Sequence, residues 1–180
     1  MTTYIALLRG VNVGGHAKVA MADLRDLLTR LGLQDARSLL QSGNLVFRSD
    51  SRKAGDIERR LQAQTRAHLG IDTQFFVRSA VEWATIIAGN PFPAEAEREP
   101  GHLLVLFLKR VPDTDQTEAL RAAVTGPEVV RAEGRQVYVV YPNGTGRSRL
   151  TSALIERKLG TSVTGRNWNT VLKLMALAKA

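Results

Sequence analysis

The amino-acid sequence predicts an α+β fold of two ferredoxin-like (split βαβ) repeats packed together, with a linking helix and a C-terminal closing helix. Two observations carry this prediction. Residues 1–79 give the order strand, helix, strand, strand, helix, strand, and residues 102–165 repeat that order at low sequence similarity. We therefore expect a first half at 1–79, a linking helix and Pro-rich loop at 80–101, and a second half with the closing helix at 102–180.

The first half begins with "TYIALLR" at 3–9, a strand that is apolar on both faces and should be buried on both. In the next segment, 21–31, leucines recur at helical spacing, and Gly32 is a natural helix stop. The dipeptide "SG" at 42–43 predicts a tight hairpin. The remaining elements are expected as strands at 37–41, 44–49 and 73–79 and a helix at 52–68.

The second half opens with "HLLVLFL" at 102–108, which matches the first strand in character. Asp113 is the expected N-cap of its first helix, Gly134 marks a hairpin turn, and Gly160 closes its second helix. The other elements are expected as helices at 113–124 and 147–160 and strands at 128–134, 135–142 and 161–165.

Two segments lie outside the repeats. Residues 90–101 contain several prolines and are expected to be a loop after the linking helix. The closing helix, "NWNTVLKLMALAKA", carries an apolar stripe that should dock on a sheet. The stripe consists of Val171, Leu174, Met175 and Ala178.

The composition is that of a globular protein, with 44% hydrophobic and 23% charged residues. No apolar run approaches the roughly 20 residues that a membrane span needs, and no secretory signal is seen, so a soluble, cytoplasmic protein without a membrane partner is expected. Cysteine is absent, which excludes disulfides, thiol catalysis and thiolate metal sites. The net charge of +8 invites a nucleic-acid interpretation, but arginines scattered beside acids are more typical of a solvated surface.

The segment "RGVNVGGHAKV" at 9–19 concentrates glycines and polar residues between a strand and a helix. In a split βαβ unit the first and second strands run in the same direction, so the segments that follow them lie at the same edge of the sheet. This loop should therefore lie beside "QSGN" at 41–44. Glycine-loop amides ahead of a helix are suited to holding an anion, although "GVNVGG" lacks the spacing of known phosphate loops. The alternative is a wide turn whose glycines merely permit the path.

Three motifs, "LLRGVNVGG", "LQSGNLVF" and "TGRNWNTVLKLMALA", resemble the bacterial domain of unknown function numbered 1697. The resemblance runs from Tyr4 to Ala178. It implies an α+β fold of two ferredoxin-like halves, in agreement with the repeat, and it brings no catalytic residues.

Other residues leave alternatives open. Arg9 ends a buried strand, so its guanidinium either grips a carboxylate or phosphate or is satisfied by its own loop or a buried acid. His16 could be an acid or base but is more often simply exposed. Asn167 fits an N-cap, Trp168 either packs in the core or stacks on a ligand, and Arg166 precedes a helix N-terminus that favours anions.

We therefore expect a small anionic metabolite or nucleotide as ligand, with no metal or cofactor. The sequence decides neither for nor against an enzyme. A nucleic-acid binder or a protein-interaction module are the alternatives. The candidate ligand-binding residues, expected to form one pocket, are Arg9, Gly10, Asn12, Gly14, Gly15, Gln41, Ser42, Asn44, Arg166, Asn167, Trp168 and Asn169.

Overall fold

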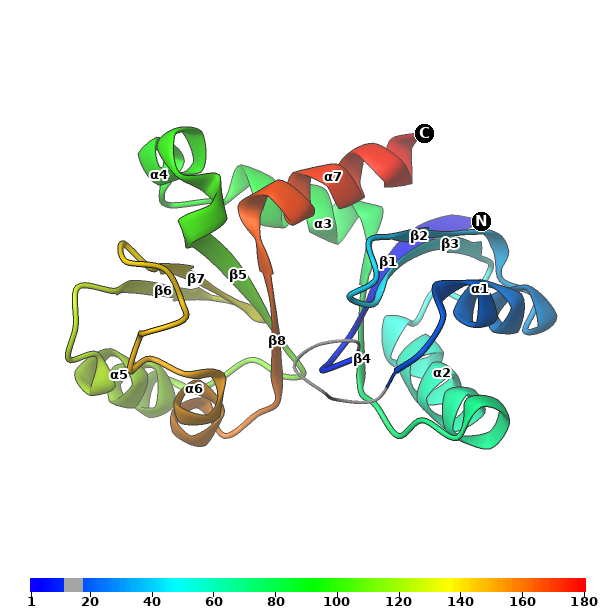
Figure 1. The fold of residues 1–180 in the computed structure, drawn as a ribbon, viewed down its shortest axis with the longest axis horizontal. Coiled ribbons are helices and arrows are strands. Elements are labelled where there is room, and N and C mark those ends of the chain that lie inside the picture. The colour runs from blue at the N-terminus through cyan, green and yellow to red at the C-terminus, as the bar shows by residue number, and fades with distance from the viewer. Residues whose placement is uncertain (12–17) are drawn as a thin grey trace. The chain divides into compact units, whose positions relative to one another are not determined.

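The computed structural model describes residues 1–11 and 18–180 (Figure 1). The chain divides into two compact units. The first unit consists of Met1–Thr85 with Lys173–Ala180, and the second unit consists of Ile86–Leu172. Each unit contains a four-stranded antiparallel sheet, and the fold is α+β as the sequence predicts.

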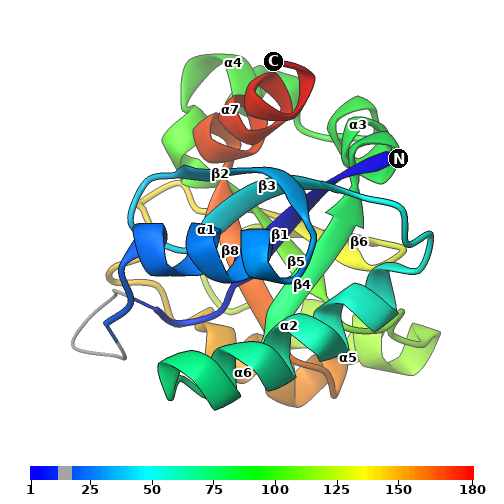
Figure 2. The same cartoon turned by 90° about the vertical axis from the view of Figure 1, so that its right-hand side faces the viewer.

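The first unit follows the split βαβ order. Its elements are β1 (Thr2–Leu8), α1 (Met21–Arg30), β2 (Gln34–Leu39), β3 (Asn44–Ser49), α2 (Ala54–Leu69), β4 (Phe75–Ser79) and the start of α3 (Ala80–Ala88). The strands lie in the order β2-β3-β1-β4, and every neighbouring pair is antiparallel. Figure 2 shows α1 and α2 together on one face of this sheet.

The core of the first unit lies between those helices and the sheet. Leu24 of α1 and Leu61 of α2 pack with residues such as Phe47 on the facing side of the strands. The alternate residues of β1, Ile5 and Leu7, are also buried. Both faces of β1 are therefore shielded from water, which confirms the interpretation of "TYIALLR" as a strand buried on both faces.

The second unit repeats the order. Its elements, with the helices that flank them, are α4 (Pro93–Arg98), the 3-10 turn η1 (Pro100–His102), β5 (Leu103–Leu108), α5 (Thr114–Ala123), β6 (Val129–Glu133), β7 (Gln136–Val140), α6 (Ser152–Leu159), β8 (Val163–Asn167) and α7 (Trp168–Lys179). The sheet order is β6-β7-β5-β8, the same pattern as in the first unit.

The repeat extends to single hydrogen bonds. The Leu8 N–H donates to the Gly43 carbonyl at 2.9 Å, and the Leu108 N–H donates to the Arg135 carbonyl at the same distance. Each of these leucines also ends the first strand of its unit, so Leu8 and Leu108 are equivalent positions.

Several expected helix and turn signals are confirmed. The Asp113 side chain accepts a hydrogen bond from the Gln116 N–H, and the Asp113 N–H donates one to the Gln116 side-chain oxygen, which completes a capping box. Gly160 ends α6 with a φ of +61°, and Gly134 has a φ of +57° in the β6–β7 turn.

Two expectations were wrong. Residues 90–101 are not a plain loop, because Pro93 occupies the first turn of α4, where a missing N–H costs nothing. Helix α6 does not begin at 147, because the Thr151 hydroxyl caps it by accepting from the Leu154 N–H. The basic, glycine-containing residues before Thr151 form a loop.

Candidate functional site

The two glycine-bearing segments of the first unit meet where β1 ends. Besides the bond from Leu8 to Gly43, a Cβ placed on Gly43 would lie 2.8 Å from Cγ2 of Val11. The loop after β1 and the β2–β3 turn are therefore neighbours, as the topology of the split βαβ unit requires. Four positions singled out in the sequence, Asn12, Gly14, Gly15 and His16, lie outside the described residues.

Arg9 lies just beyond β1 and is exposed, whereas the sequence suggested a guanidinium at the end of a buried strand. Its Nη1 donates to Oε1 of Gln74 at 3.3 Å, and its backbone N–H donates to the Gln74 carbonyl at 3.1 Å. The Thr73 hydroxyl donates to the Arg9 carbonyl at 2.8 Å. A neutral amide and two backbone contacts thus hold Arg9 against the start of β4.

Thr73 and Gln74 add a third segment to this site, and the sequence analysis missed them. The signal was present in the topology. Because β4 runs antiparallel to β1, the loop before β4 must lie where β1 ends. We call this region, formed by residues 9–11, 41–44 and 73–74, the β1-end site.

The β2–β3 turn owes its shape to Asn44. This side chain is fully buried, and its amide donates to the Leu39 carbonyl at 2.9 Å and to the Ser42 hydroxyl at 3.1 Å. Leu40 and Gly43 have φ values of +60° and +80°, so the turn contains two left-handed residues. Asn44 and Ser42 therefore contribute to the β1-end site by fixing this turn, while Gln41 is exposed on it.

Gly10 also adopts a left-handed conformation, with a φ of +65°, and no atom of residues 1–11 and 18–180 outside its chain neighbours lies within 4 Å of the place a Cβ would take. As far as those residues are concerned, the backbone next to Arg9 is open on this side. A ligand can approach the main chain there more closely than at a residue with a side chain.

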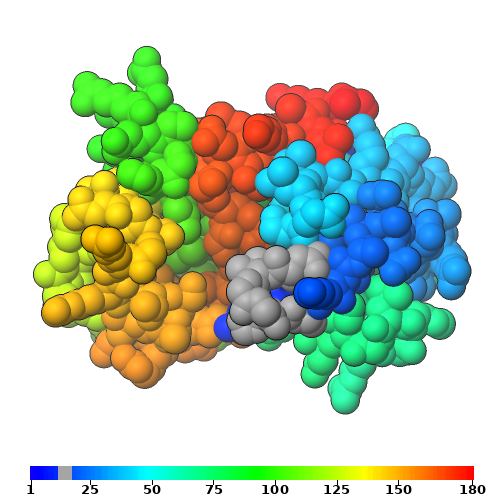
Figure 3. Space-filling model, viewed as in Figure 1, coloured from blue at the N-terminus to red at the C-terminus, as the bar shows by residue number. Residues whose placement is uncertain are grey.

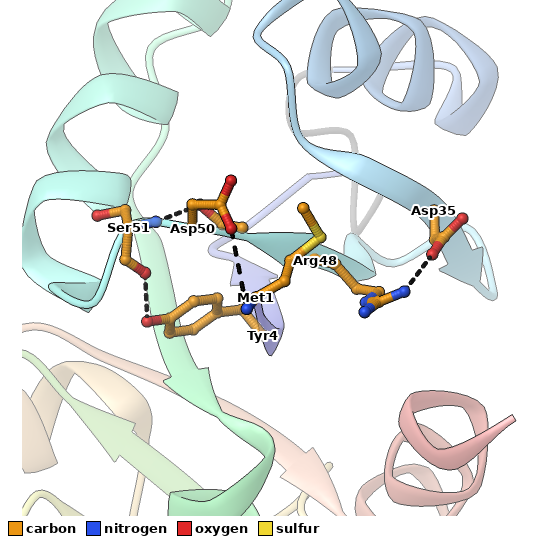
Figure 4. Close-up of polar contacts among 7 residues, drawn as sticks. Met1, Tyr4, Asp35, Arg48, Asp50 and Ser51 are labelled. Atoms are coloured by element: carbon orange, nitrogen blue, oxygen red, sulfur yellow. Dashed lines mark hydrogen bonds and ion pairs between the residues drawn. The ribbon is translucent and has the colours of Figure 1, made fainter.

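Charged groups at the other end of the same sheet are paired within the protein (Figure 4). The N-terminal ammonium lies 3.8 Å from the Asp50 carboxylate, and Arg48 lies 3.3 Å from Asp35. The Tyr4 hydroxyl donates to the Ser51 carbonyl at 2.8 Å, and burial raises the pKa of this hydroxyl. Arg48 and Arg9 are therefore exposed arginines at opposite ends of the same sheet, and Arg48 forms an ion pair with Asp35 whereas Arg9 donates a hydrogen bond to Gln74.

The "RNWN" residues belong to the second unit. Arg166 lies in β8 opposite Val105, and its Nη1 donates to the Thr164 hydroxyl at 3.0 Å and to the Gly165 carbonyl at 2.8 Å. Burial lowers the pKa of this guanidinium to about 10. The protein's own oxygen atoms thus satisfy part of the donor capacity of Arg166.

The remaining residues of this motif have distinct environments. Asn167 Oδ1 accepts from the Thr170 N–H at 3.0 Å, which confirms Asn167 as the N-cap of α7. Trp168 is only 5% exposed, as core packing requires, and Asn169 is exposed. A single pocket that joins these residues to the β1-end site stays a prediction.

Two features are absent from the part of the chain that the structure describes. No group of three or more His, Asp or Glu side chains there is arranged to hold a metal ion. No helix there is both long and apolar enough to cross a bilayer.

Comparison with known proteins places this fold in a family. A family model described as "Protein of unknown function (DUF1697)" matches residues 1–138, which include both glycine-bearing motifs of the first unit. The chain belongs to the DUF1697 family. The sequence resemblance is thereby confirmed. A search of curated proteins gave no match.

A solved structure extends the likeness beyond the matched residues. The conserved bacterial protein SP0830 from Streptococcus pneumoniae is 27% identical in sequence, with a TM-score of 0.75. The match covers 98% of this chain and 98% of that one. The fold of this chain is therefore shared with that protein over nearly its whole length, including the second unit.

Proposed function

We propose that this DUF1697 protein binds a small anionic metabolite, such as a nucleotide, at the β1-end site. The observation that carries the proposal is the environment of Arg9. Its guanidinium is exposed, is hydrogen-bonded to the neutral amide of Gln74, and lies next to the open backbone of Gly10. An exposed guanidinium with a defined position can bind a carboxylate or phosphate through paired N–H donors.

The other candidate residues have supporting parts in this proposal. Asn44 and Ser42 fix the adjacent turn, and Gln41 is exposed on that turn. The glycines at 14 and 15, with Asn12, would supply backbone and side-chain donors. Arg166 and Asn169 would complete the pocket if the two motif regions meet.

Burial of the aromatic side chains argues against the nucleic-acid alternative. An RNA-recognition sheet stacks bases on exposed aromatics. In the first sheet Phe47, Phe75 and Phe76 are fully buried, and Tyr4 is 3% exposed. The described sheet therefore offers no aromatic platform for bases, and a small anion suits the β1-end site better.

The test is a thermal-shift and calorimetry panel on the full chain with ATP, AMP, inorganic phosphate, citrate and a short oligonucleotide. A ligand at a hundred times its dissociation constant stabilises a protein by about 2.7 kcal/mol. Hydrogen bonds to charged groups contribute about 1.5–3 kcal/mol. Arg9→Ala should therefore lower the affinity for the best-binding small anion by at least about tenfold.

Arg48→Ala is the matched control, because it removes the same charge from the other end of the same sheet. It should leave affinity for the small anion unchanged. Equal affinity in both variants, or no small anion that binds, would refute the proposal. Binding of the oligonucleotide alone, weakening steeply with salt, would favour the nucleic-acid alternative.

A further inference from the structure

The second unit contains a cavity of about 580 Å³ that the proposed function does not use. It lies between the α5–β6 connection and the β7–α6 connection, the yellow-green and orange segments beside β6 in Figure 1. Its volume falls within the range of small-molecule sites in proteins, about 300–1,000 Å³. The lining residues from the two connections are Thr125, Gly126, Pro127, Glu128, Asn143, Gly144, Arg147, Ser148 and Arg149.

Residues 143–149, which we call the cavity loop, are anchored at both ends by Tyr141. The Gly144 N–H donates to the Tyr141 carbonyl at 3.0 Å, and the Tyr141 hydroxyl donates to the Leu150 carbonyl at 2.9 Å. Tyr141 is itself 4% exposed and part of the core of the second unit. The loop is thus closed by hydrogen bonds to a buried side chain and its backbone, so its shape is defined before any ligand arrives.

A second set of bonds ties the cavity loop to the opposite wall. The Ser148 hydroxyl donates to Oε1 of Glu128 at 2.6 Å and accepts from the Leu150 N–H at 3.0 Å. A Cβ at Gly126 would collide with the Glu128 carboxylate, so the glycine leaves room for that group. The two connections are therefore joined across the cavity by a serine and a carboxylate.

Two arginine side chains that line the cavity have no partner among the described residues. Arg147 and Arg149 are exposed on either side of Ser148. Within residues 1–11 and 18–180, no hydrogen bond or ion pair occupies either guanidinium. Glu128 is the acid of the lining, and one of its oxygens already accepts from Ser148. The space-filling view in Figure 3 shows the yellow-to-orange part of the chain that contains this loop on the side facing the viewer.

We propose that this cavity is a second binding site, specific for a phosphomonoester of a small polyhydroxylated molecule. Arg147 and Arg149 bind the phosphate dianion, since guanidinium groups match phosphate oxygens with paired donors. The second carboxylate oxygen of Glu128 accepts a hydrogen bond from a hydroxyl of the ligand. Two cations and one carboxylate suit one phosphate with an adjacent hydroxyl, whereas the carboxylate repels a continuous nucleic-acid backbone.

Ribose 5-phosphate and inorganic phosphate are the probes, titrated into the full-length protein by calorimetry and by ¹⁵N-resolved NMR. Ribose 5-phosphate should shift the amide signals of Gly126, Gly144 and Gly146. The double variant Arg147→Ala/Arg149→Ala should bind both probes at least about tenfold more weakly than the wild type. The matched control is Arg121→Ala/Arg157→Ala, which removes the same charge from exposed positions on α5 and α6 outside the cavity lining and should bind as the wild type does.

Glu128→Gln separates the two halves of the ligand. An amide oxygen can still accept from Ser148, so the loop tie remains, but the negative acceptor for the ligand hydroxyl is gone. The affinity for ribose 5-phosphate should fall severalfold in this variant, while the affinity for inorganic phosphate should not fall. Thermal melting of every variant confirms that it is folded.

Three results would overturn the proposal. They are equal loss in both double variants, binding of an oligonucleotide but neither phosphate probe, and amide shifts confined to residues outside the cavity. Arg9→Ala, measured alongside, should bind ribose 5-phosphate at this cavity normally. The failure of this inference is therefore distinguishable from the failure of the β1-end site.

Discussion

Two glycines with nearly the same positive φ have very different surroundings. Gly32 has a φ of +77° and nothing within 4 Å of a built Cβ. Gly43 has a φ of +80°, but its Cβ would lie 2.8 Å from Cβ of Leu8 and Cγ2 of Val11. The conformation alone explains glycine at the first position. At Gly43 the packing of the β2–β3 turn against the end of β1 also excludes a side chain.

Alanine substitutions at these glycines should separate the two effects. Gly32→Ala should lower the free energy of unfolding by about 1–2 kcal/mol, the cost of a left-handed L-residue. Gly43→Ala should add the cost of overpacking, about 1–3 kcal/mol, so it should lower the free energy of unfolding clearly more than Gly32→Ala does. Urea unfolding followed by circular dichroism measures both. Equal losses would mean that the turn can move away from Leu8 at little cost.

The residue scale also shows where sequence reasoning about the site stops. The meeting of the Gly43 turn with the β1 end followed from topology and is confirmed. The exposure of Arg9 did not follow, because it depends on β1 ending at Leu8, and strand ends are set by pairing with neighbours. The burial of Asn44 was likewise missed, since a polar residue in a turn motif suggests exposure until its bond to Leu39 is known.

At the scale of elements, helix caps were the most dependable sequence signals. Asp113, Thr151 and Asn167 each accept a hydrogen bond from a backbone N–H in the first turn of a helix. Of these, Thr151 is not predicted from the sequence, because the pattern of "RSRLTSALIERKLG" at 147–160 suggests a single helix. The first part of that segment carries no helical apolar stripe, and its arginines flank a serine that bonds to Glu128. A loop stabilised by a long-range bond has no local signature.

The capping box of α5 gives a prediction at this scale. Asp113→Ala removes the acceptor of the Gln116 N–H and should cost about 1 kcal/mol of stability. Asp115→Ala, in the same first turn, loses only a favourable interaction with the helix dipole, about 0.3–1 kcal/mol. Urea midpoints at unchanged slope compare the two variants. A smaller effect for Asp113→Ala than for Asp115→Ala would contradict the capping role.

Over the whole molecule, the repeat was predictable because it rests on element order rather than on sequence identity. Each run of strand, helix, strand, strand, helix, strand can form one four-stranded antiparallel sheet with short connections. The structure gives both sheets that same order. The cavity of the second unit was not predictable in this way. It arises where the connections of the two repeats differ, and the first unit has no counterpart of the long β7–α6 loop in its sequence.

Buried tyrosines make the stability of the whole protein depend on alkaline pH. Tyr138 donates to the Ile86 carbonyl at 2.6 Å, and Tyr141 donates to the Leu150 carbonyl at 2.9 Å. Burial, with a smaller contribution from a nearby glutamate, raises the pKa of each hydroxyl to about 12. An unfolded tyrosine titrates near pH 10, so between pH 10 and 12 the unfolded chain loses these protons while the folded protein keeps them.

Because the unfolded state then binds fewer protons, the free energy of unfolding should fall as pH rises through this window. Each tyrosine contributes at most about 1.4 kcal/mol per pH unit. Urea unfolding at pH 8, 10 and 11 measures the slope, and Tyr141→Phe is the informative variant. It lacks one of the three tyrosine hydroxyls whose pKa is raised, so its stability should fall less steeply above pH 10. It should also be less stable than the wild type at pH 8, because the hydrogen bond to the Leu150 carbonyl is lost. Parallel pH profiles for the two proteins would show that Tyr141 titrates at its ordinary pKa and that its hydroxyl is open to water.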